Sequence, residues 1–362
     1  MNGLSRIKSV NKYGFKFPVK LFVITIFITL VFYILACCIG SVYISPMTLL
    51  KISLNQTMMF DFDTNWPKSH ETILLNLRLP RITLAAIVGA GLAFSGTIYQ
   101  GLFKNPLADP YLVGAAAGAA LGATIVISIP WITQINPNIL PIAAFIGAMS
   151  AVLISYFIAR NSIGLNLGTL ILSGVAISTL LGAITTLLMI KSNPDVRPVL
   201  SWLMGSFISS QWIHCMITLC YLIPCLIISI VYSRILNVMQ LHDNHAKSIG
   251  VDLEKVKLIM IVTATLTTAA CVSFVGLVGF VGLICPHAVR LMWSKDYRIL
   301  VPASAIIGAA FLIFSDTSAR TILGNTELPI GIITAFCGVP FFIFLLIKQR
   351  WGAYGKSDYR NV

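Results

Sequence analysis

The chain consists of long apolar runs separated by short polar segments. Most runs hold about 20 residues, the length that an α-helix needs to cross the hydrocarbon core of a bilayer. Because lipid offers no partner to backbone N–H and C=O groups, each run should be helical unless protein or water covers it. The pattern predicts an all-α, polytopic membrane protein of about ten transmembrane helices: Leu21–Ile44, Ile82–Leu102, Tyr111–Ile129, Ile139–Ile158, Leu167–Ile190, Trp212–Tyr232, Leu258–Val275, Phe280–Trp293, Ile299–Phe314 and Leu328–Ile347.

Some of these spans should be short or broken. Ile299–Phe314 is short but uninterrupted, whereas Phe280–Trp293 is too short to cross alone. The expected organisation is a cytoplasmic N-terminal segment, a transmembrane domain with one external and one cytoplasmic loop, and a cytoplasmic tail. The corresponding ranges are 1–20, 21–347, 45–77, 233–257 and 348–362.

Composition supports a membrane protein and charge placement argues against nucleic acid as a partner. The chain is 57% hydrophobic and 10% charged, with a mean hydropathy of +0.90, whereas soluble domains carry about 25% charged residues. With the N-terminus inside and ten spans, 18 of the 25 lysines and arginines fall on the cytoplasmic side. This bias follows the positive-inside rule, and basic residues at both ends favour an even number of crossings.

The cysteines and the N-terminus suggest nothing beyond membrane packing. None of the eight cysteines forms a CxxC pair, so they are interpreted as small buried apolar residues, and no metal site is predicted. The basic start followed by Leu21–Ile44 imitates a signal peptide, but this apolar run is longer than the core of a signal peptide. It is expected to be the first anchor.

Glycine spacing predicts close helix contacts. Gly114, Gly118 and Gly122 recur every four residues, which places them on nearly one helix face where another backbone can approach. A faint internal echo also joins Ala86–Ala90 to Ala305–Ala309, each with glycine at its fourth position. The echo is weak support for an internal repeat of the kind found in transporters.

Two motifs carry a family resemblance. The first is Arg78-Leu-Pro-Arg81, followed by an apolar run and then by Phe103-Lys-Asn-Pro-Leu-Ala-Asp-Pro110. The second is the glycine-rich Gly276–Arg290 segment, which reads Gly-Phe-Val-Gly-Leu and then Pro-His and Arg. Its glycines permit bends, and its proline cannot continue a helix hydrogen-bond ladder. Together the motifs resemble the permease subunits of the importers for iron-siderophores, heme and vitamin B12 that belong to the type II ABC class.

The resemblance implies the partners. It predicts a dimer with a second copy of the chain or a close homologue, two ATPase subunits and an extracytoplasmic binding protein or lipoprotein, in a bacterial cytoplasmic membrane. This chain should bind no cofactor, since ATP and magnesium would bind the ATPase. Gly355-Lys356-Ser357 imitates the end of a P-loop, but Arg350 stands where the earlier glycine is required and no strand precedes it.

The resemblance also implies a docking site. Arginines at the positions of Arg78, Arg81 and Arg320 receive carboxylates of the binding protein in related permeases, and arginine–carboxylate pairs can be bidentate and directional. Two other interpretations stand beside this one. Asp316 is four residues before Arg320 and could form a local helical pair. Arg78 and Arg81 could be ordinary interfacial anchors.

Further sites are implied inside the membrane and on its cytoplasmic face. The 233–257 loop would dock into the ATPase, with Ala246 and Gly250 as the matching small residues. The cytoplasmic gate would be the Asn105-Pro106-Leu107 turn, and no gate role is transferred to the start of the Leu167–Ile190 span. The broken-helix signature comprises Gly279, Phe280, Gly282, Pro286, His287 and Arg290. Its histidine could be a ligand, although a structural hydrogen bond is the more ordinary role.

Two other function classes are disfavoured. A gradient-driven carrier usually needs an ionisable group inside its bundle, and the predicted spans contain no acid and only His214, His287 and Arg290 among ionisable histidine, lysine and arginine residues. An intramembrane enzyme lacks support because there is no HExxH motif or convincing serine–histidine pair. The expected function is import of an iron-siderophore complex, with heme and cobalamin as alternative cargoes.

Overall fold

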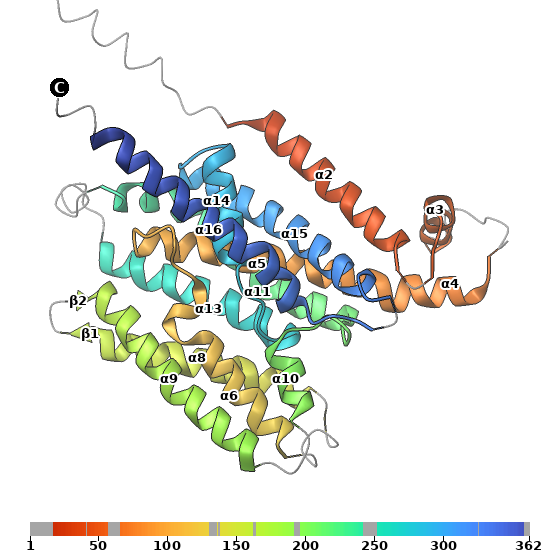
Figure 1. Ribbon diagram of the computed structural model, residues 1–362, viewed down its shortest axis with the longest axis horizontal. Coiled ribbons are helices and arrows are strands. Elements are labelled where there is room, and N and C mark those ends of the chain that lie inside the picture. The colour runs from red at the N-terminus through yellow and green to blue at the C-terminus, as the bar shows by residue number, and fades with distance from the viewer. Residues whose placement is uncertain are drawn as a thin grey trace, which may run out of the picture.

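The computed structural model describes residues 17–40, 42–56, 66–129, 136, 138–161, 164–191, 196–241, 252–324 and 326–357. Helices dominate this part of the chain, with one very short hairpin (Figure 1). In chain order the elements are α2 (Val19–Cys38), α3 (Pro46–Asn55), α4 (Lys68–Thr72), η2 (Ile73–Arg78), α5 (Leu79–Leu102), η3 (Pro110–Val113), α6 (Ala115–Ile127), α8 (Ile139–Ala159), β1 (Arg160–Asn161), β2 (Gly164–Leu165), α9 (Leu167–Lys191), α10 (Arg197–Leu203), α11 (Trp212–Met239), α13 (Leu253–Val275), α14 (Val281–Met292), α15 (Tyr297–Thr321) and α16 (Ile330–Ser357).

The helices confirm the prediction of about ten spans, some of them short. Seven described helices are long and apolar enough to cross a membrane, and three shorter apolar helices join them. The short ones are α6, α14 and the apolar part of α16. Each of the ten helices overlaps one predicted run. Helix α14 continues through Pro286 over its 12 residues, so the expected break at this proline is absent and the bend lies before the helix.

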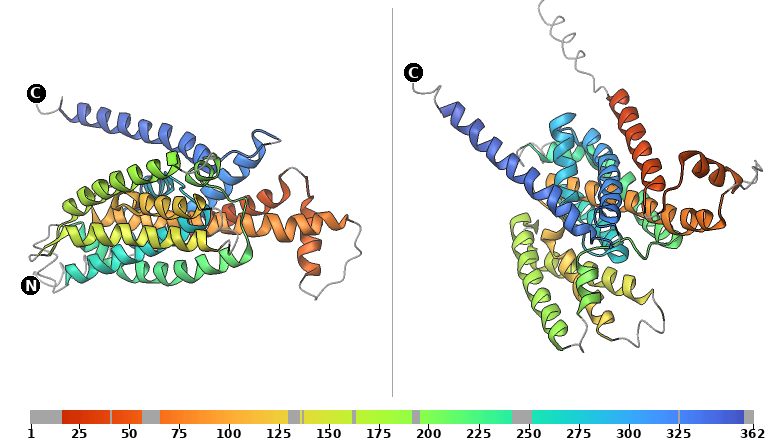
Figure 2. Two further views of the ribbon diagram at one scale, coloured as in Figure 1. Left: turned by 90° about the horizontal axis from the view of Figure 1, so that it is seen from below. Right: turned by 45° about the vertical axis from the view of Figure 1, so that its right-hand side comes forward.

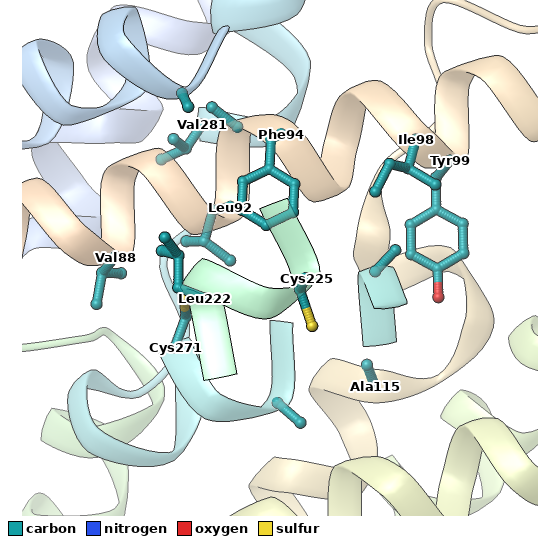
Figure 3. Packing of buried hydrophobic residues seen from close by; sticks show 14 of the residues in the cluster. Val88, Leu92, Phe94, Ile98, Tyr99, Ala115, Leu222, Cys225, Cys271 and Val281 are labelled. Atoms are coloured by element: carbon teal, nitrogen blue, oxygen red, sulfur yellow. The ribbon is translucent and has the colours of Figure 1, made fainter. Parts of the chain in front are cut away.

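Helix α5 is the centre of the molecule. It lies between α15 and α2 on one side and α11 and α13 on the other (Figure 1), and 83% of its most apolar stretch is buried. Figure 3 shows Leu92 and Tyr99 of α5 among side chains from its neighbours, including Leu222 of α11 and Cys271 of α13. Helix α5 is therefore in contact with several helices along its length.

Glycines let the helices of this core touch backbone to backbone. A Cβ added at Gly89 of α5 would lie 2.2 Å from the carbonyl oxygen of Gly308 on α15. These are the glycines of the two segments that echo each other in sequence. In the same way, a Cβ at Gly118 of α6 would lie 2.2 Å from the carbonyl oxygen of Gly147 on α8. The predicted close approach is confirmed for Gly118 and Gly122, whereas Gly114 precedes α6 with φ +98° and does not lie on the helix face.

A second group of helices lies beside the core. Helices α6, α8 and α9 pack together, and α13 connects them to α5 (Figure 1). Antiparallel strands β1 and β2 form a hairpin between α8 and α9, with Arg160 opposite Leu165. Helix α16 runs along the outside of the core, and its C-terminal part projects away (Figure 2).

Several helices do not end where the predicted spans do. Helix α15 continues to Thr321, seven residues past the predicted end at Phe314, so Asp316 lies inside a helix and is only 1% exposed. The statement that the spans contain no acid therefore fails for α15. Helix α11 continues to Met239 and α13 begins at Leu253, so both helices extend into the predicted 233–257 loop.

Candidate functional site

Arg78 is buried at the start of α5, where η2 joins it. Only 5% of the residue is exposed. Its Nη1 donates to the carbonyl oxygens of Cys37 at 2.8 Å and Cys38 at 3.3 Å, and its Nη2 donates to the carbonyl oxygen of Val42. The last carbonyls of a helix lack partners within the helix, so Arg78 supplies the missing donors to α2, whose last residue is Cys38.

Arg81 and Arg320 share one buried carboxylate. Asp316 lies 2.9 Å from Arg81 Nη2 and 3.1 Å from Arg320 Nε. Arg81 also pairs with Glu327 at 2.9 Å, whose side chain is 39% exposed, and Arg320 Nη2 donates to the carbonyl oxygen of Ala36. We call Arg78, Arg81, Asp316, Arg320 and Glu327 the arginine cluster.

The arginine cluster brings together the three arginines predicted for docking, each of them with partners inside the chain. The local pair between Asp316 and Arg320 is present. Docking itself stays a prediction, and any incoming carboxylate would have to exchange with these internal partners.

The other end of α5 is held by a buried amide. Gln100 is 1% exposed; its Nε2 donates to the carbonyl oxygen of Gly282 at 2.9 Å, and its Oε1 accepts from Arg290 Nη1. Its backbone carbonyl accepts from Asn105 N–H at 3.1 Å. We call Gln100, Gly282, Arg290 and Asn105 the amide node. It joins the predicted gate turn to the broken-helix signature.

The predicted gate turn packs against the signature through side chains as well. Asn105 Oδ1 accepts from Leu107 N–H at 2.9 Å, which closes the turn. Pro106 and Leu107 line a narrow cleft with Phe280 and His287 of the signature. The rings of His287 and Phe341 meet edge to face, with their centroids 6.0 Å apart. The Nδ1 atom of His287 has no hydrogen-bond partner among the described residues.

The segment before α14 is sharply bent. Gly276 has φ +75°, and a Cβ there would lie 2.0 Å from the carbonyl oxygen of Trp202, so only glycine fits. Phe280 has φ +68°, a conformation that is strained for an aromatic residue. Tyr111 Oη donates to the carbonyl oxygen of Val278 at 3.0 Å and holds the bend. We call 276–280 the bent segment.

The bent segment forms one wall of an open, groove-like cavity of about 710 Å³. Helices α10 and α16 supply the other walls. The lining is apolar and aromatic except for backbone groups and the Tyr111 hydroxyl, and it comprises Tyr111, Leu203, Met204, Leu277, Gly279, Phe280, Gly331, Ile332, Ala335, Phe336, Val339 and Pro340. Such a cavity suits an organic molecule rather than a bare ion.

Two carboxylates stand between the spans at the amide-node end. Burial raises the pKa of Asp109 to about 6, against the hydrogen bond that it accepts from Tyr111 N–H. Asp296 is partly buried, which opposes ionisation, but hydrogen bonds from Arg298 and from Asn237 Nδ2 outweigh this and lower its pKa. Asp296 thereby ties the start of α15 to the last turns of α11.

The predicted coupling residues Ala246 and Gly250 lie outside the described residues. The described flanks of their loop carry polar contacts that sequence reasoning did not identify, at Gln240 and Glu254. Gln100 was also missed, although an amide in the last turn of an apolar span is itself a signal, because a buried polar group needs a partner.

The sequence of the chain is similar to those of several permease proteins of import systems. The chain is 45% identical over 280 residues to the cobalamin import system permease protein BtuC of Halobacterium salinarum, covering 77% of this chain and 74% of the relative. It is 37% identical over 304 residues to the hemin transport system permease protein HmuU of Yersinia pestis, covering 83% and 90%. It is 30% identical over 339 residues to the iron(3+)-hydroxamate import system permease protein FhuG of Bacillus subtilis, covering 92% and 98%.

A solved structure shares the fold over almost the whole chain. It is described as an inward-facing conformation of a metal-chelate type ABC transporter, and it matches with a TM-score of 0.79 and 29% identity over 92% of this chain and all of that one. The FecCD transport family model matches residues 28–348. The chain thus belongs to the FecCD transport family and is a membrane permease subunit of an ABC importer.

Proposed function

We propose that this permease imports an iron-siderophore complex, delivered by an extracytoplasmic binding protein and driven by ATP hydrolysis on two partner ATPase subunits. The cavity between α10, the bent segment and α16 carries this proposal. Its apolar and aromatic walls fit the organic shell of a chelate, and its volume of about 710 Å³ lies in the range of sites for small organic ligands. A second copy of the chain, or a close homologue, would complete the pathway in a bacterial cytoplasmic membrane.

Cobalamin is the second candidate cargo, and the relatives divide between the two. The iron-hydroxamate relative aligns with 92% of this chain. The cobalamin relative aligns with 77% but is 45% identical. The larger aligned share of the chain favours a siderophore as cargo, whereas the higher sequence identity favours cobalamin. Heme is a third candidate through the hemin relative.

The arginine cluster supports the proposed docking of a binding protein at Arg81. Of its four charged side chains other than Arg78, only Glu327 is substantially exposed. A partner carboxylate could replace Glu327 on Arg81 without breaking the buried pair with Asp316. Arg78 and Arg320 would then hold the docking surface in shape, in addition to any direct contact.

Transport by the complete complex tests the proposal. Permease, ATPase and binding protein are reconstituted in proteoliposomes, and uptake of ⁵⁵Fe-siderophore, labelled cyanocobalamin and hemin is measured with and without ATP. We expect ATP-dependent uptake of the siderophore. Equal uptake without ATP, or no uptake of any of the three chelates, would contradict the proposed function, and uptake of cobalamin alone would replace the cargo.

A cavity variant links the measurement to the site. Ala335 lines the cavity, so Ala335→Trp should reduce uptake strongly by narrowing it. Ile343 is on the same helix, half exposed and not part of the cavity lining, so Ile343→Trp is the matched control. Normal uptake by Ala335→Trp would show that the cargo takes another route.

A further inference from the structure

The two flanks of the predicted coupling loop each make a side-chain hydrogen bond to a different part of the permease. Helix α11 ends at Met239 and α13 begins at Leu253. Gln240 follows the end of α11, and Glu254 lies in the first turn of α13. Both reach backbone groups far away in the sequence, 139 and 89 residues distant.

Gln240 reaches the start of the gate turn. Its Nε2 donates to the carbonyl oxygen of Gly101 at 2.9 Å and to that of Leu236 at 3.1 Å. Gly101 is in the last turn of α5, and the same carbonyl accepts from Lys104 N–H at 3.4 Å as the chain leaves the helix. Lys104 Nζ in turn donates to the carbonyl oxygen of Leu241 at 3.1 Å. Two bonds of opposite direction therefore hold the end of α11 against the turn that carries Asn105.

Glu254 reaches the hairpin from which α9 begins. Its Oε2 accepts from Leu165 N–H at 2.7 Å, and its Oε1 pairs with Lys257 Nζ at 3.1 Å. Gly164 has φ +129°, and a Cβ there would approach the Glu254 carboxyl carbon to 2.9 Å, so glycine makes room for the carboxylate. Asn166, which follows Leu165, uses its Oδ1 to accept from Thr169 N–H at 3.0 Å in the first turn of α9.

We propose that Gln240 and Glu254 are positioning residues that connect the predicted coupling loop, residues 233–257, to two separate segments, the gate turn after α5 and the hairpin before α9. This inference rests on the proposed function. A displacement of the loop would pull on both segments together, since each flank carries its own bond. The connection uses backbone groups of the receiving segments, so it does not depend on the side chains that line the gate.

Matched substitutions to methionine remove each bond while keeping the side-chain length. Gln240→Met lacks the donor and Glu254→Met lacks the acceptor. Lys255→Met is the control, since Lys255 is on the same turn of α13 with its side chain 79% exposed. Glu254→Gln keeps an acceptor oxygen, and Gln240→Lys keeps a donor, so these are the rescue variants.

The readout is cargo transported per ATP hydrolysed by the complete complex in proteoliposomes. We expect this ratio to fall about tenfold in Glu254→Met, because its bond to Leu165 involves a charged group, and about threefold in Gln240→Met, whose bond is neutral. The ratio should stay within about twofold of wild type in Lys255→Met and in the rescue variants, because they keep both bonds or replace the lost group. ATP hydrolysis should remain in all of them.

Unchanged transport per ATP in both methionine variants would overturn the inference. So would a proportional fall in ATP hydrolysis, transport and complex yield, since that is the result of a purely structural role. If a methionine variant does not insert, Gln240→Glu and Glu254→Lys, which reverse the bonding character of each residue, decide by the same ratio. A wild-type complex that takes up no chelate would contradict the proposed function instead.

Discussion

At one end α5 carries Arg78 and Arg81, which bind carboxylates and helix-end carbonyls, whereas at the other end it carries Gln100, a neutral amide between a backbone carbonyl and an arginine. The ends are 22 residues apart, about 33 Å along a helix, close to the thickness of the bilayer core. The arginine end joins α5 to α2 and α15, and the glutamine end joins it to α14 and the gate turn.

The difference indicates that charged contacts serve as a fixed support at one end of α5, whereas neutral contacts allow movement at the other end. A shared carboxylate between two arginines is strong only while all its members are present, because a lost partner leaves a buried charge. That suits a fixed support. The bond from the Gln100 amide to the Gly282 carbonyl is neutral and therefore weaker, which suits a contact that must change during a transport cycle. We therefore expect the arginine end to be static and the glutamine end to rearrange.

The largest effect is expected from Asp316→Asn. This change keeps the shape but leaves Arg81 and Arg320 without their shared charge, and breaking a buried pair typically costs about 3–5 kcal/mol. The thermal unfolding temperature in detergent should fall sharply. If instead stability is unchanged and only binding-protein affinity moves, the arginine end is not a fixed support.

A smaller effect should come from Gly96→Ala, in the half of α5 that leads to the amide node. A Cβ at Gly96 would lie 2.2 Å from the carbonyl oxygen of Gly282, which also binds Gln100, and overpacking costs about 1–3 kcal/mol. Gly182→Ala in α9 is the control, since a Cβ there meets nothing within 4 Å.

Both uptake and the thermal unfolding temperature should be measured for Gly96→Ala, because the comparison separates a loss of function from a loss of stability. We expect uptake to fall further than stability does, because the displaced α14 carries the signature that faces the gate turn. If Gly96→Ala and Gly182→Ala show the same uptake and the same unfolding temperature, the close contact of α5 with α14 is dispensable.

The smallest effect on stability is expected from Glu327→Gln. Glu327 is the exposed partner of Arg81, and exposed pairs contribute about 0–1 kcal/mol. The unfolding temperature should barely change, while affinity for the binding protein, measured by surface plasmon resonance, should rise as Arg81 loses its internal competitor. Weaker binding would argue that Glu327 itself belongs to the docking surface.

The spans were predictable because apolar length is a direct consequence of bilayer thickness. The bend before α14 followed from the glycines that precede it, and the close contacts of α6 followed from the spacing of Gly118 and Gly122. Each of these is a local property of the sequence, and each is present in the structure.

The polar contacts were harder to predict because their partners are distant in sequence. Asp316 was expected to lie beyond a span, since an acid normally ends an apolar helix, yet pairing with Arg81, 235 residues away, allows its burial. Gln100 lies 182 residues from Gly282. Neither partner could be chosen from periodicity, and strands as short as β1 and β2 leave no alternation to detect.

The hydrogen bonds of Arg78 to the end of α2 bear on how the chain enters the membrane. Arg78 follows Cys37 by 41 residues. A ribosome that adds about 5–20 residues per second needs about 2–8 s to reach it. During that interval the last carbonyls of α2 have no arginine, so water at the membrane surface must solvate them. A nascent chain that is cut before Arg78 should therefore hold its first helix at a shallower depth than a chain that has passed it.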